Sequence, residues 1–447
     1  MDISTIVNQN IYKSWVKFVI PTMIGILLST IYSAVDAIFV GQGVGEVGLA
    51  SINIVWPSVA VVMGIGMMIG VGSSNIISIC LGNNEIEDAE KCLGTALKFI
   101  LLIGLVLMIL GLSFREPILK ILGANDETIG YARDYYTIIY IIIIPYILSI
   151  ALSTIVRTEG RPDLSMFMIG IGAVINIILD YILVIKYNFG TKGAAIATSG
   201  SIFISMIISI YYFTKGNSKI KFRKEYFKID LEILSKILRI GFVSFAIQFS
   251  YAVIIWVQNN VIYNYGTTKD IAIFTVAAYI NCFIVNLFMG IGQGVQPLIG
   301  YYLGASKEQK IKEIMKFSTI IGIVFGILCL GMLFIFGEKI VYVFGIDSKD
   351  LKFASDMMIV YCFGTPIIGI LFTSSSFYQI REKTLYSNVI SISRGFVFQF
   401  IFTIIMPVYF GVIGVFLSLP LAELVSLLIL IIIILFDKKI VNKYTKK

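Results

Sequence analysis

Long apolar runs follow one another along the whole chain, with short polar stretches between them. Each is about 20 residues or longer, the length that an α-helix needs to cross the roughly 30 Å hydrocarbon core of a bilayer. Apolar residues fill consecutive positions, which excludes the two-residue alternation of a transmembrane β-barrel. The runs cover approximately residues 15–41, 52–80, 92–113, 133–156, 164–186, 192–213, 237–264, 271–302, 316–337, 353–378, 386–409 and 411–436. The pattern predicts an all-α polytopic membrane protein with twelve transmembrane helices.

Basic residues concentrate in every second connection between these runs. The longest connection, residues 214–239, carries eight lysines and arginines against three acids. Basic connections stay on the cytoplasmic side of a membrane. We therefore expect a multi-pass protein of the cell membrane with both termini and this linker in the cytoplasm. The linker's charge suits lipid headgroups, and we expect membrane lipid rather than nucleic acid as its partner.

The composition agrees with a membrane protein and restricts which side chains could carry a proton. Of the 447 residues, 58% are hydrophobic and 14% are charged, the net charge is +8, and there is no histidine. Without imidazole, a proton carrier inside the membrane has to be a carboxylate. The five cysteines have no paired spacing and are typical of small core residues.

An internal repeat divides the chain into two halves. LGNNE at 81–85 recurs as LGASK at 303–307, a shift of 222 positions, and a shift of 221 carries Pro145 onto Pro366. Since each half has an even number of spans, both enter the membrane from the same side, as parallel repeats do. We predict an N-terminal six-helix lobe (1–214), a basic cytoplasmic linker (215–236), and a C-terminal six-helix lobe with a basic tail (237–447). Such lobes enclose a central cavity that opens to either side as they rock.

Two acids lie within apolar runs of the first half. Asp36 is in the first run, and Asp180 is in the fifth, four residues after Asn176 and so on the same helical face. An ionised carboxylate in the bilayer centre costs about 3 kcal/mol on insertion scales, so it normally faces a cavity or a partner. No basic residue lies in those helix centres. We predict that Asp36, Asn176, Asp180 and Thr198 form one cation site; the alternative is that each acid pairs with a polar neighbour to hold helices together.

Two kinds of cation fit this set. Two carboxylates in one low-dielectric site repel each other and favour sharing a proton. Carboxylate, amide and hydroxyl oxygens also suit a hard cation, so Na⁺ could bind at the same four residues. The sequence leaves H⁺ and Na⁺ both open. The second half has no such acids, because the shift places Gln258 opposite Asp36 and Ile401 opposite Asp180.

Several of these features together resemble the multidrug and toxic compound extrusion (MATE) family of transporters. They are Pro21 with Asp36 in the first run, the glycine-rich second and eighth runs ending in LGNN and LGAS, the RTEGRP loop after the fourth run, the Asn-x-x-x-Asp pair of the fifth, and Thr198. The resemblance covers essentially the whole chain. It implies that the four predicted site residues bind the coupling ion, H⁺ or Na⁺, in the N-terminal lobe. It also implies that Pro21 is a hinge in the bend tied to drug release; the alternative is that Pro21 only makes a static kink.

The chain departs from the family at a second site. Some relatives also use carboxylates in the seventh and tenth spans, where this chain has Gln248, Gln258 and Asn259 in the seventh and only uncharged polar residues in the middle and end of the tenth. We expect the ion site in the N-terminal lobe alone. Candidates for hydrogen bonds to a substrate, or equally for contacts between helices, are Gln248, Gln258, Asn259, Tyr279 and Asn281. Arg394 and Glu423 lie within the last two runs, and we interpret them as a structural ion pair rather than as substrate contacts.

These observations predict a secondary active efflux antiporter that exports amphipathic drugs and toxic compounds, which we expect to be cationic, in exchange for H⁺ or Na⁺. We expect no catalytic residues and no cofactor besides the coupling ion, and a monomer as the functional unit. The alternative is a lipid-linked oligosaccharide flippase of the same superfamily. That function requires a strongly basic cavity, whereas the helix centres hold few basic residues, chiefly Arg394. An intramembrane enzyme lacks the histidine or metal-ligand set that it would need.

Overall fold

The computed structural model describes residues 3–344 and 346–445, and it leaves undescribed the side chains of residues 3, 4, 252, 256, 259, 268 and 438–445. In this part of the chain nearly every residue is helical. Eleven helices are long and apolar enough to cross a membrane, and a twelfth span is completed if one bent helix pair counts as one. The predicted all-α class is confirmed.

The chain folds into two compact units, and each is built from two separate segments of the sequence. Unit 1 comprises Met1–Phe249 and Gln296–Ile311, and unit 2 comprises Ser250–Val295 and Lys312–Lys447. The lobe boundaries expected from the repeat, at residues 214 and 237, stay a prediction.

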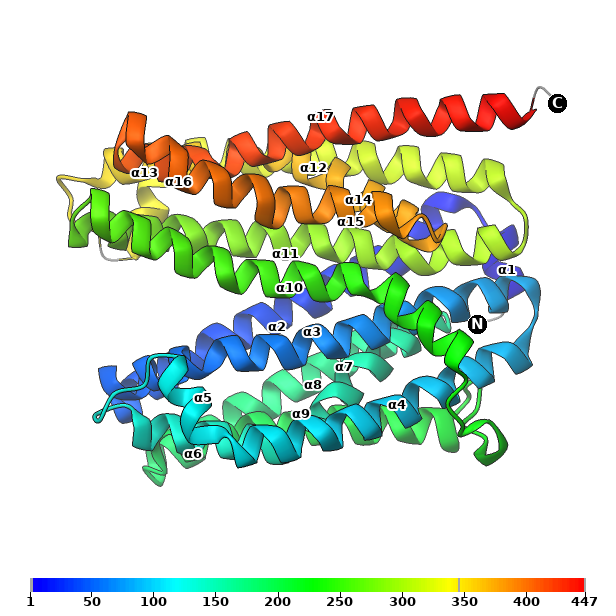
Figure 1. The fold of residues 1–447 in the computed structure, drawn as a ribbon, viewed down its shortest axis with the longest axis horizontal. Helices are drawn as coiled ribbons and strands as arrows, with labels where there is room; N and C mark the ends of the chain where they lie inside the picture. The colour runs from blue at the N-terminus through cyan, green and yellow to red at the C-terminus, as the bar shows by residue number, and fades with distance from the viewer. Residues whose placement is uncertain (1–2, 345, 446–447) are drawn as a thin grey trace. The chain divides into compact units, whose positions relative to one another are not determined.

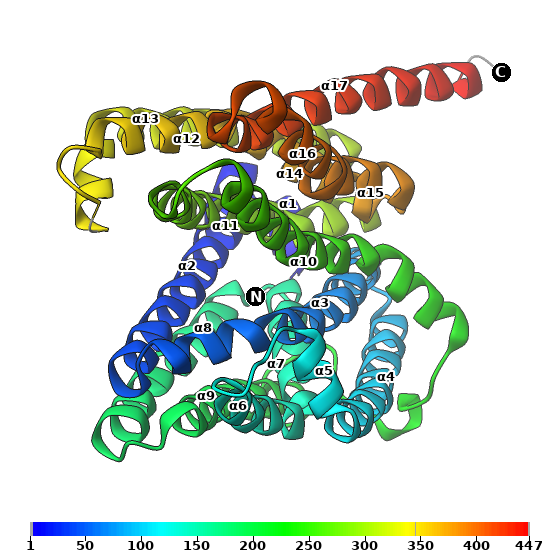
Figure 2. The ribbon, with the colours of Figure 1, turned by 60° about the vertical axis from the view of Figure 1, so that its left-hand side comes forward.

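Unit 1 is a bundle in which α2 packs along α8, α3 along α7, and α8 along α9 (Figures 1 and 2). Its helices are α1 (Ile3–Asn8), α2 (Ile11–Val44), α3 (Glu46–Asn83), α4 (Ile86–Ser113), α5 (Arg115–Ile121), α6 (Ile129–Ile141), α7 (Ile143–Thr158), α8 (Pro162–Asp180), the π-helix η1 (Tyr181–Lys186), α9 (Gly190–Thr214), the 3₁₀ turn η2 (Lys224–Tyr226) and the first part of α10 (Leu231–Tyr265).

Unit 2 contains the rest of the helices. Among them α16 and α17 pack along each other, and α13 and α14 also lie against α17 (Figure 1). They are α11 (Thr268–Gly304), α12 (Glu308–Val343), α13 (Leu351–Tyr361), α14 (Thr365–Ile380), α15 (Thr384–Ile392), the π-helix η3 (Ser393–Val397), α16 (Phe398–Phe410) and α17 (Val412–Thr445). The last residues of α11 and the first of α12 belong to unit 1.

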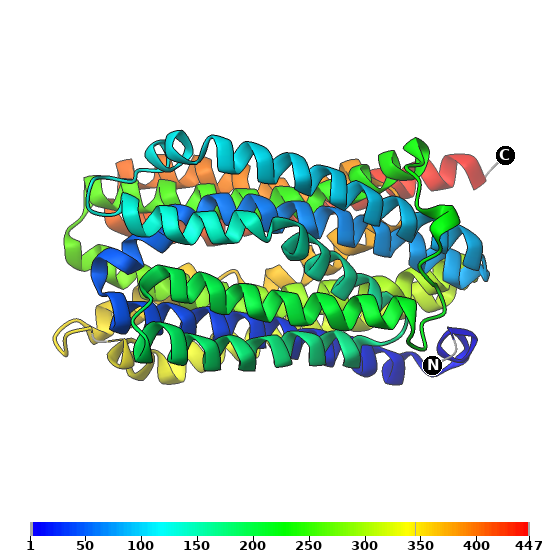
Figure 3. The same ribbon diagram turned by 90° about the horizontal axis from the view of Figure 1, so that it is seen from below.

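The fourth predicted span is broken into α6 and α7, which meet at an angle of 59° (Figure 3). Pro145 lies in the first turn of α7, where its missing N–H and its ring prevent a regular helix from continuing from Ile141. The repeat-related Pro366 lies at the start of α14, but α13 and α14 together make one span, Leu351–Ile380, without so large a bend. By contrast, Pro21 and Pro57 lie inside continuous helices.

Small residues let the helices of unit 1 approach closely. A Cβ at Gly72 would lie 2.1 Å from the carbonyl oxygen of Ile237, and one at Gly241 would lie 1.8 Å from that of Met68. Both contacts join α3 to α10, and neither leaves room for a methyl group. The glycine-rich segment of residues 64–72 therefore packs helices together, as small residues do in membranes.

The linker is tied to the helices of unit 1 by two buried acids. Glu159, only 2% exposed, accepts a hydrogen bond of 2.7 Å from the backbone N–H of Ile220 and lies 2.7 Å from the Ser218 hydroxyl, which in turn contacts the Ile220 carbonyl. Glu90 accepts a hydrogen bond from the backbone N–H of Lys221 and pairs with Arg223 at 2.7 Å.

The hydrogen bonds around Glu159 form a closed ring if its carboxyl group carries a proton. The acid then donates to Ser218, Ser218 donates to the Ile220 carbonyl, and the Ile220 N–H donates back to the acid, so that the one hydroxyl proton of Ser218 is used once. Burial raises the pKa of Glu159 and outweighs the opposing effect of the hydrogen bonds from Ile220, Ser218, Tyr212 and Lys219. Both observations favour the neutral acid.

We expect this anchor to loosen as pH rises. A carboxyl group whose pKa is raised by folding contributes stability below its unfolded pKa and loses that contribution as pH rises through the folded value. Tryptic cleavage between residues 215 and 228 should therefore accelerate with pH in the wild type. Glu159→Gln keeps the ring with an amide donor, so its cleavage rate should follow only the pH dependence of trypsin itself, and Glu159→Ala should be cleaved faster at every pH. An identical pH response in wild type and Glu159→Gln would contradict this account.

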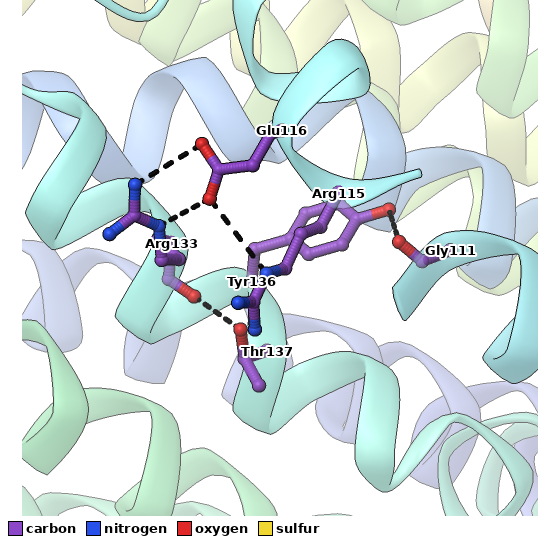
Figure 4. Close-up of polar contacts among 6 residues, drawn as sticks. All are labelled: Gly111, Arg115, Glu116, Arg133, Tyr136 and Thr137. Carbon is purple, nitrogen blue, oxygen red and sulfur yellow. Dashed lines mark hydrogen bonds and ion pairs between the residues drawn. The ribbon is translucent and has the colours of Figure 1, made fainter. Parts of the chain in front are cut away.

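At the α5–α6 end of unit 1, a second acid is held by arginine (Figure 4). Glu116 pairs with Arg133, whose Nη2 is 3.2 Å from Oε2, and Arg115 lies 3.8 Å away. The hydrogen bond from Arg133 lowers the pKa of Glu116. Nearby, the Tyr136 hydroxyl donates to the Gly111 carbonyl at 3.2 Å. This cluster is partly exposed and fixes α5 against α6.

Candidate functional site: a buried carboxyl pair

The structure brings Asp36 and Asp180 together inside unit 1. Asp36 lies in α2 and Asp180 ends α8, and these two helices pack along each other. The two carboxyl groups act on each other directly. Asp180 is fully buried, and apart from the Asp36 carboxyl group neither of its oxygens has a hydrogen-bond partner among the described residues; Oδ1 of Asp36 likewise has none besides Asp180.

Asn176 completes the buried face of α8. It is fully buried one turn before Asp180, and both polar atoms of its amide lack a hydrogen-bond partner in the described part of the chain. Leaving a buried polar group unpaired costs about 1 to 3 kcal/mol. Three neighbouring side chains with unused oxygens and no described basic neighbour form a site that lacks positive charge.

The structure does not show Thr198 in contact with the carboxyl pair. It lies half-buried on α9, which packs against both α2 and α8. Among the described hydrogen bonds none joins its hydroxyl to the carboxyl pair, so its membership of the site stays a prediction.

Three tyrosines surround the pair, and none of them was among the predicted site residues. Tyr32 lies one turn before Asp36 on α2, while Tyr135 of α6 and Tyr146 of α7 come from the two halves of the broken span. The charge of Asp36 acts on all three hydroxyl groups, and that of Asp180 acts on Tyr135 as well. The four-residue spacing of Tyr32 and Asp36 was a usable signal. Nothing in the sequence indicated the other two.

The backbone changes its helical form at the site. The α-helical hydrogen bonds of α8 end at Asp180, and the π-helix η1 follows at once, in which Tyr187 N–H donates to the carbonyl five residues earlier, on Ile182, at 3.0 Å. Such wide turns within membrane helices frequently occur at functional positions.

The predicted substrate contacts are dispersed. Gln248 belongs to unit 1 and lies near Gly64, and Tyr279 is 63% exposed. Asn281 is buried with an unpaired amide nitrogen, and the side chain of Asn259 lies outside the described residues. For Tyr279 and Asn281 the substrate and packing interpretations both stay open.

Two other predicted polar residues contact neighbouring helices within unit 2. Gln258 is fully buried, Tyr361 donates to it at 3.3 Å, and its amide is 3.4 Å from the Ser418 hydroxyl, so it bridges three helices. Arg394 and Glu423 do form an ion pair, with 3.5 Å between Nη2 and Oε1.

Comparison with known proteins places the chain in a family. A family model described as MatE matches residues 21–182 and 240–405, which is most of the chain and includes Asp36, Asn176 and Asp180. The chain belongs to the MatE family. The predicted resemblance to multidrug and toxic compound extrusion transporters is therefore confirmed.

Individual relatives align with this chain over almost their full length. The chain is 28% identical over 438 residues to the multidrug export protein MepA of Staphylococcus saprophyticus subsp. saprophyticus, covering 98% of this chain and 96% of that protein. It is equally identical, over 436 residues, to MepA of Staphylococcus aureus strain NCTC 8325, covering 97% and 96%. Among solved structures, a MATE protein in complex with MaD3S superposes with a TM-score of 0.91 at 23% identity, covering 100% and 99%. The MatE fold, in a multi-pass membrane protein, is thus established for this chain.

Proposed function

We propose that this MatE protein is a secondary active antiporter that exports amphipathic, cationic compounds in exchange for H⁺ or Na⁺. The observation that carries the proposal is the buried pair of Asp36 and Asp180 beside Asn176, which has unused oxygens and no described basic partner. The names of the MepA relatives support small-molecule drugs as the exported class.

The pair can couple ion movement to export because it favours a bound cation. A proton shared by Asp36 and Asp180, or Na⁺ held by their oxygens with those of Asn176 and Thr198, would neutralise charge that the buried site otherwise leaves uncompensated. The surrounding tyrosines supply hydroxyl groups, which can donate to a carboxylate or accept from a carboxylic acid.

An ion drives export only if it stabilises one access state more than the other. Binding at a site between α2 and α8 meets that requirement if the two helices separate differently in the two states. Pro21 in α2 is the proposed hinge for that movement.

We further propose that the chain lies in the cell membrane with both termini and the linker of residues 215–236 in the cytoplasm, and works as a monomer. The basic connections support this orientation.

Dye efflux from proteoliposomes tests the function. We expect purified protein to expel ethidium when a proton gradient or a sodium gradient is imposed, and the gradient that drives efflux identifies the coupling ion. Efflux under neither gradient, across a panel of cationic dyes, would contradict the antiporter. A parallel assay of lipid-linked oligosaccharide translocation would then test the flippase.

A further inference from the structure

A second buried charged pair lies in unit 2 and is not part of the carboxyl pair described above. Arg394 belongs to the π-helix η3 and Glu423 to α17, which packs against η3. The side chain of Glu423 is 1% exposed and that of Arg394 is 13% exposed. Under the 221-residue shift, Ala173 and Ile202 occupy the corresponding positions in the first half, so the pair is a feature of the second half alone.

The ion pair between Arg394 and Glu423 has poor geometry for a buried pair. Its 3.5 Å contact is longer than the roughly 2.8 Å of a charge-assisted hydrogen bond. Neither Nε of Arg394 nor Oε1 of Glu423 has a hydrogen-bond partner in the described part of the chain. A buried pair repays its desolvation only when its geometry is good and its remaining polar atoms are satisfied. As a static support this pair is therefore poor.

Arg394 also makes a cation–π contact. Its guanidinium lies over the Phe372 ring at 4.9 Å from the centroid. A ring face attracts a guanidinium without needing a counter-charge. Arg394 can therefore stay in position when Glu423 loses its negative charge.

The surroundings of Glu423 leave space only for a very small ligand. A Cβ at Gly364 would lie 1.6 Å from Oε2, so the acid sits directly against that backbone. The other titratable groups near Glu423 on the described helices are Tyr361 and Cys362, on which its charge acts, and both are neutral in ordinary conditions. Arg394 is the one described cation acting on it.

We propose that Glu423 is a second proton-binding site, and that Arg394 is held by the Phe372 ring, which it already contacts, when the proton binds. A proton from water bonds to one carboxylate oxygen, the ion pair breaks, and the positive charge remains on the guanidinium. The binding step stands independently of the antiport proposed above, while its use in transport rests on that function.

Infrared difference spectroscopy of the purified protein in lipid detects the proton without any transport. Spectra recorded between acidic and alkaline pH show the C=O band of each carboxylic acid that titrates. In the double variant Asp36→Asn, Asp180→Asn we expect a titrating band from a buried acid, and we expect Glu423→Gln to remove it. The matched control Glu338→Gln changes an exposed acid at the end of α12 and should leave the band intact.

Arg394 provides an independent check on the assignment. Arg394→Lys should preserve the titration because it keeps a cation. Arg394→Gln should leave Glu423 protonated at both ends of the pH range, so the band disappears from the difference spectrum but persists in the absolute spectrum. If the double variant does not fold, Glu423→Gln in the wild-type background should remove one component of the band. An unchanged band after Glu423→Gln, or an unchanged titration in Arg394→Gln, would overturn the proposal.

Discussion

Replacing Asp180 with asparagine should abolish gradient-driven efflux while leaving the protein folded. The two side chains have nearly the same volume, but the amide cannot carry a proton or a full negative charge. Dye efflux should fall to the rate of vesicles without protein, whichever ion couples. The thermal unfolding midpoint should stay unchanged or rise, because the substitution removes a buried charge with no described basic partner.

The matched control lies at the other end of the same helix. Asp163 pairs with Arg161 at 3.0 Å and its side chain is 57% exposed, so Asp163→Asn should transport at close to the wild-type rate. Asp36→Asn should behave like Asp180→Asn, since both carboxyl groups are needed to hold one cation. Undiminished efflux by Asp180→Asn would exclude the carboxyl pair as the coupling site.

Among glycine-to-alanine substitutions in unit 1, we expect Gly241→Ala to lower the stability most. The added carbon would lie 1.8 Å from the Met68 carbonyl oxygen, and that oxygen belongs to the backbone of α3, which cannot rotate away as a side chain can. Overpacking typically costs about 1 to 3 kcal/mol, and we expect the upper end here because a whole helix has to move. The measurement is the thermal unfolding midpoint of the purified protein, together with its yield.

Gly41→Ala provides the comparison within the same unit. Gly41 is in α2, and a Cβ there would meet nothing within 4 Å. In a helix interior alanine is favoured over glycine by about 1 kcal/mol, so this variant should be slightly more stable. Equal midpoints for the two variants would show that α3 and α10 are not in close contact.

Much of the fold followed from the sequence because a bilayer demands long apolar helices. All twelve predicted runs correspond to helices long enough to cross it, when α6 and α7 count as one. Pro145 marked the break in the fourth run. The proximity of Asp36 and Asp180 was also predictable from the bilayer. Two acids in apolar helices without basic residues nearby are costly unless they share a cation.

Other parts of the site and the fold depended on contacts between distant residues. Tyr135 and Tyr146 lie near enough to Asp36 for its charge to act on them, and no spacing in the sequence shows that. The anchor at Glu159 joins residues 59 and 61 positions apart, Ser218 and Ile220. In the printed sequence Glu159 is simply one acid in a polar loop.

The two π-helical segments affect where the chain can tolerate the insertion or deletion of a residue. Each residue turns a helix by about 100°, so an insertion or deletion within a regular α-helix swings every later side chain to a new face. A π turn already contains one residue more than an α turn. Removing one residue between 181 and 186 would tighten η1 into an α turn and leave Asn176 and Asp180 in place, and the same holds for η3 if the residue removed follows Arg394. Single-residue length differences should therefore be tolerated at these two turns far better than elsewhere in the membrane helices.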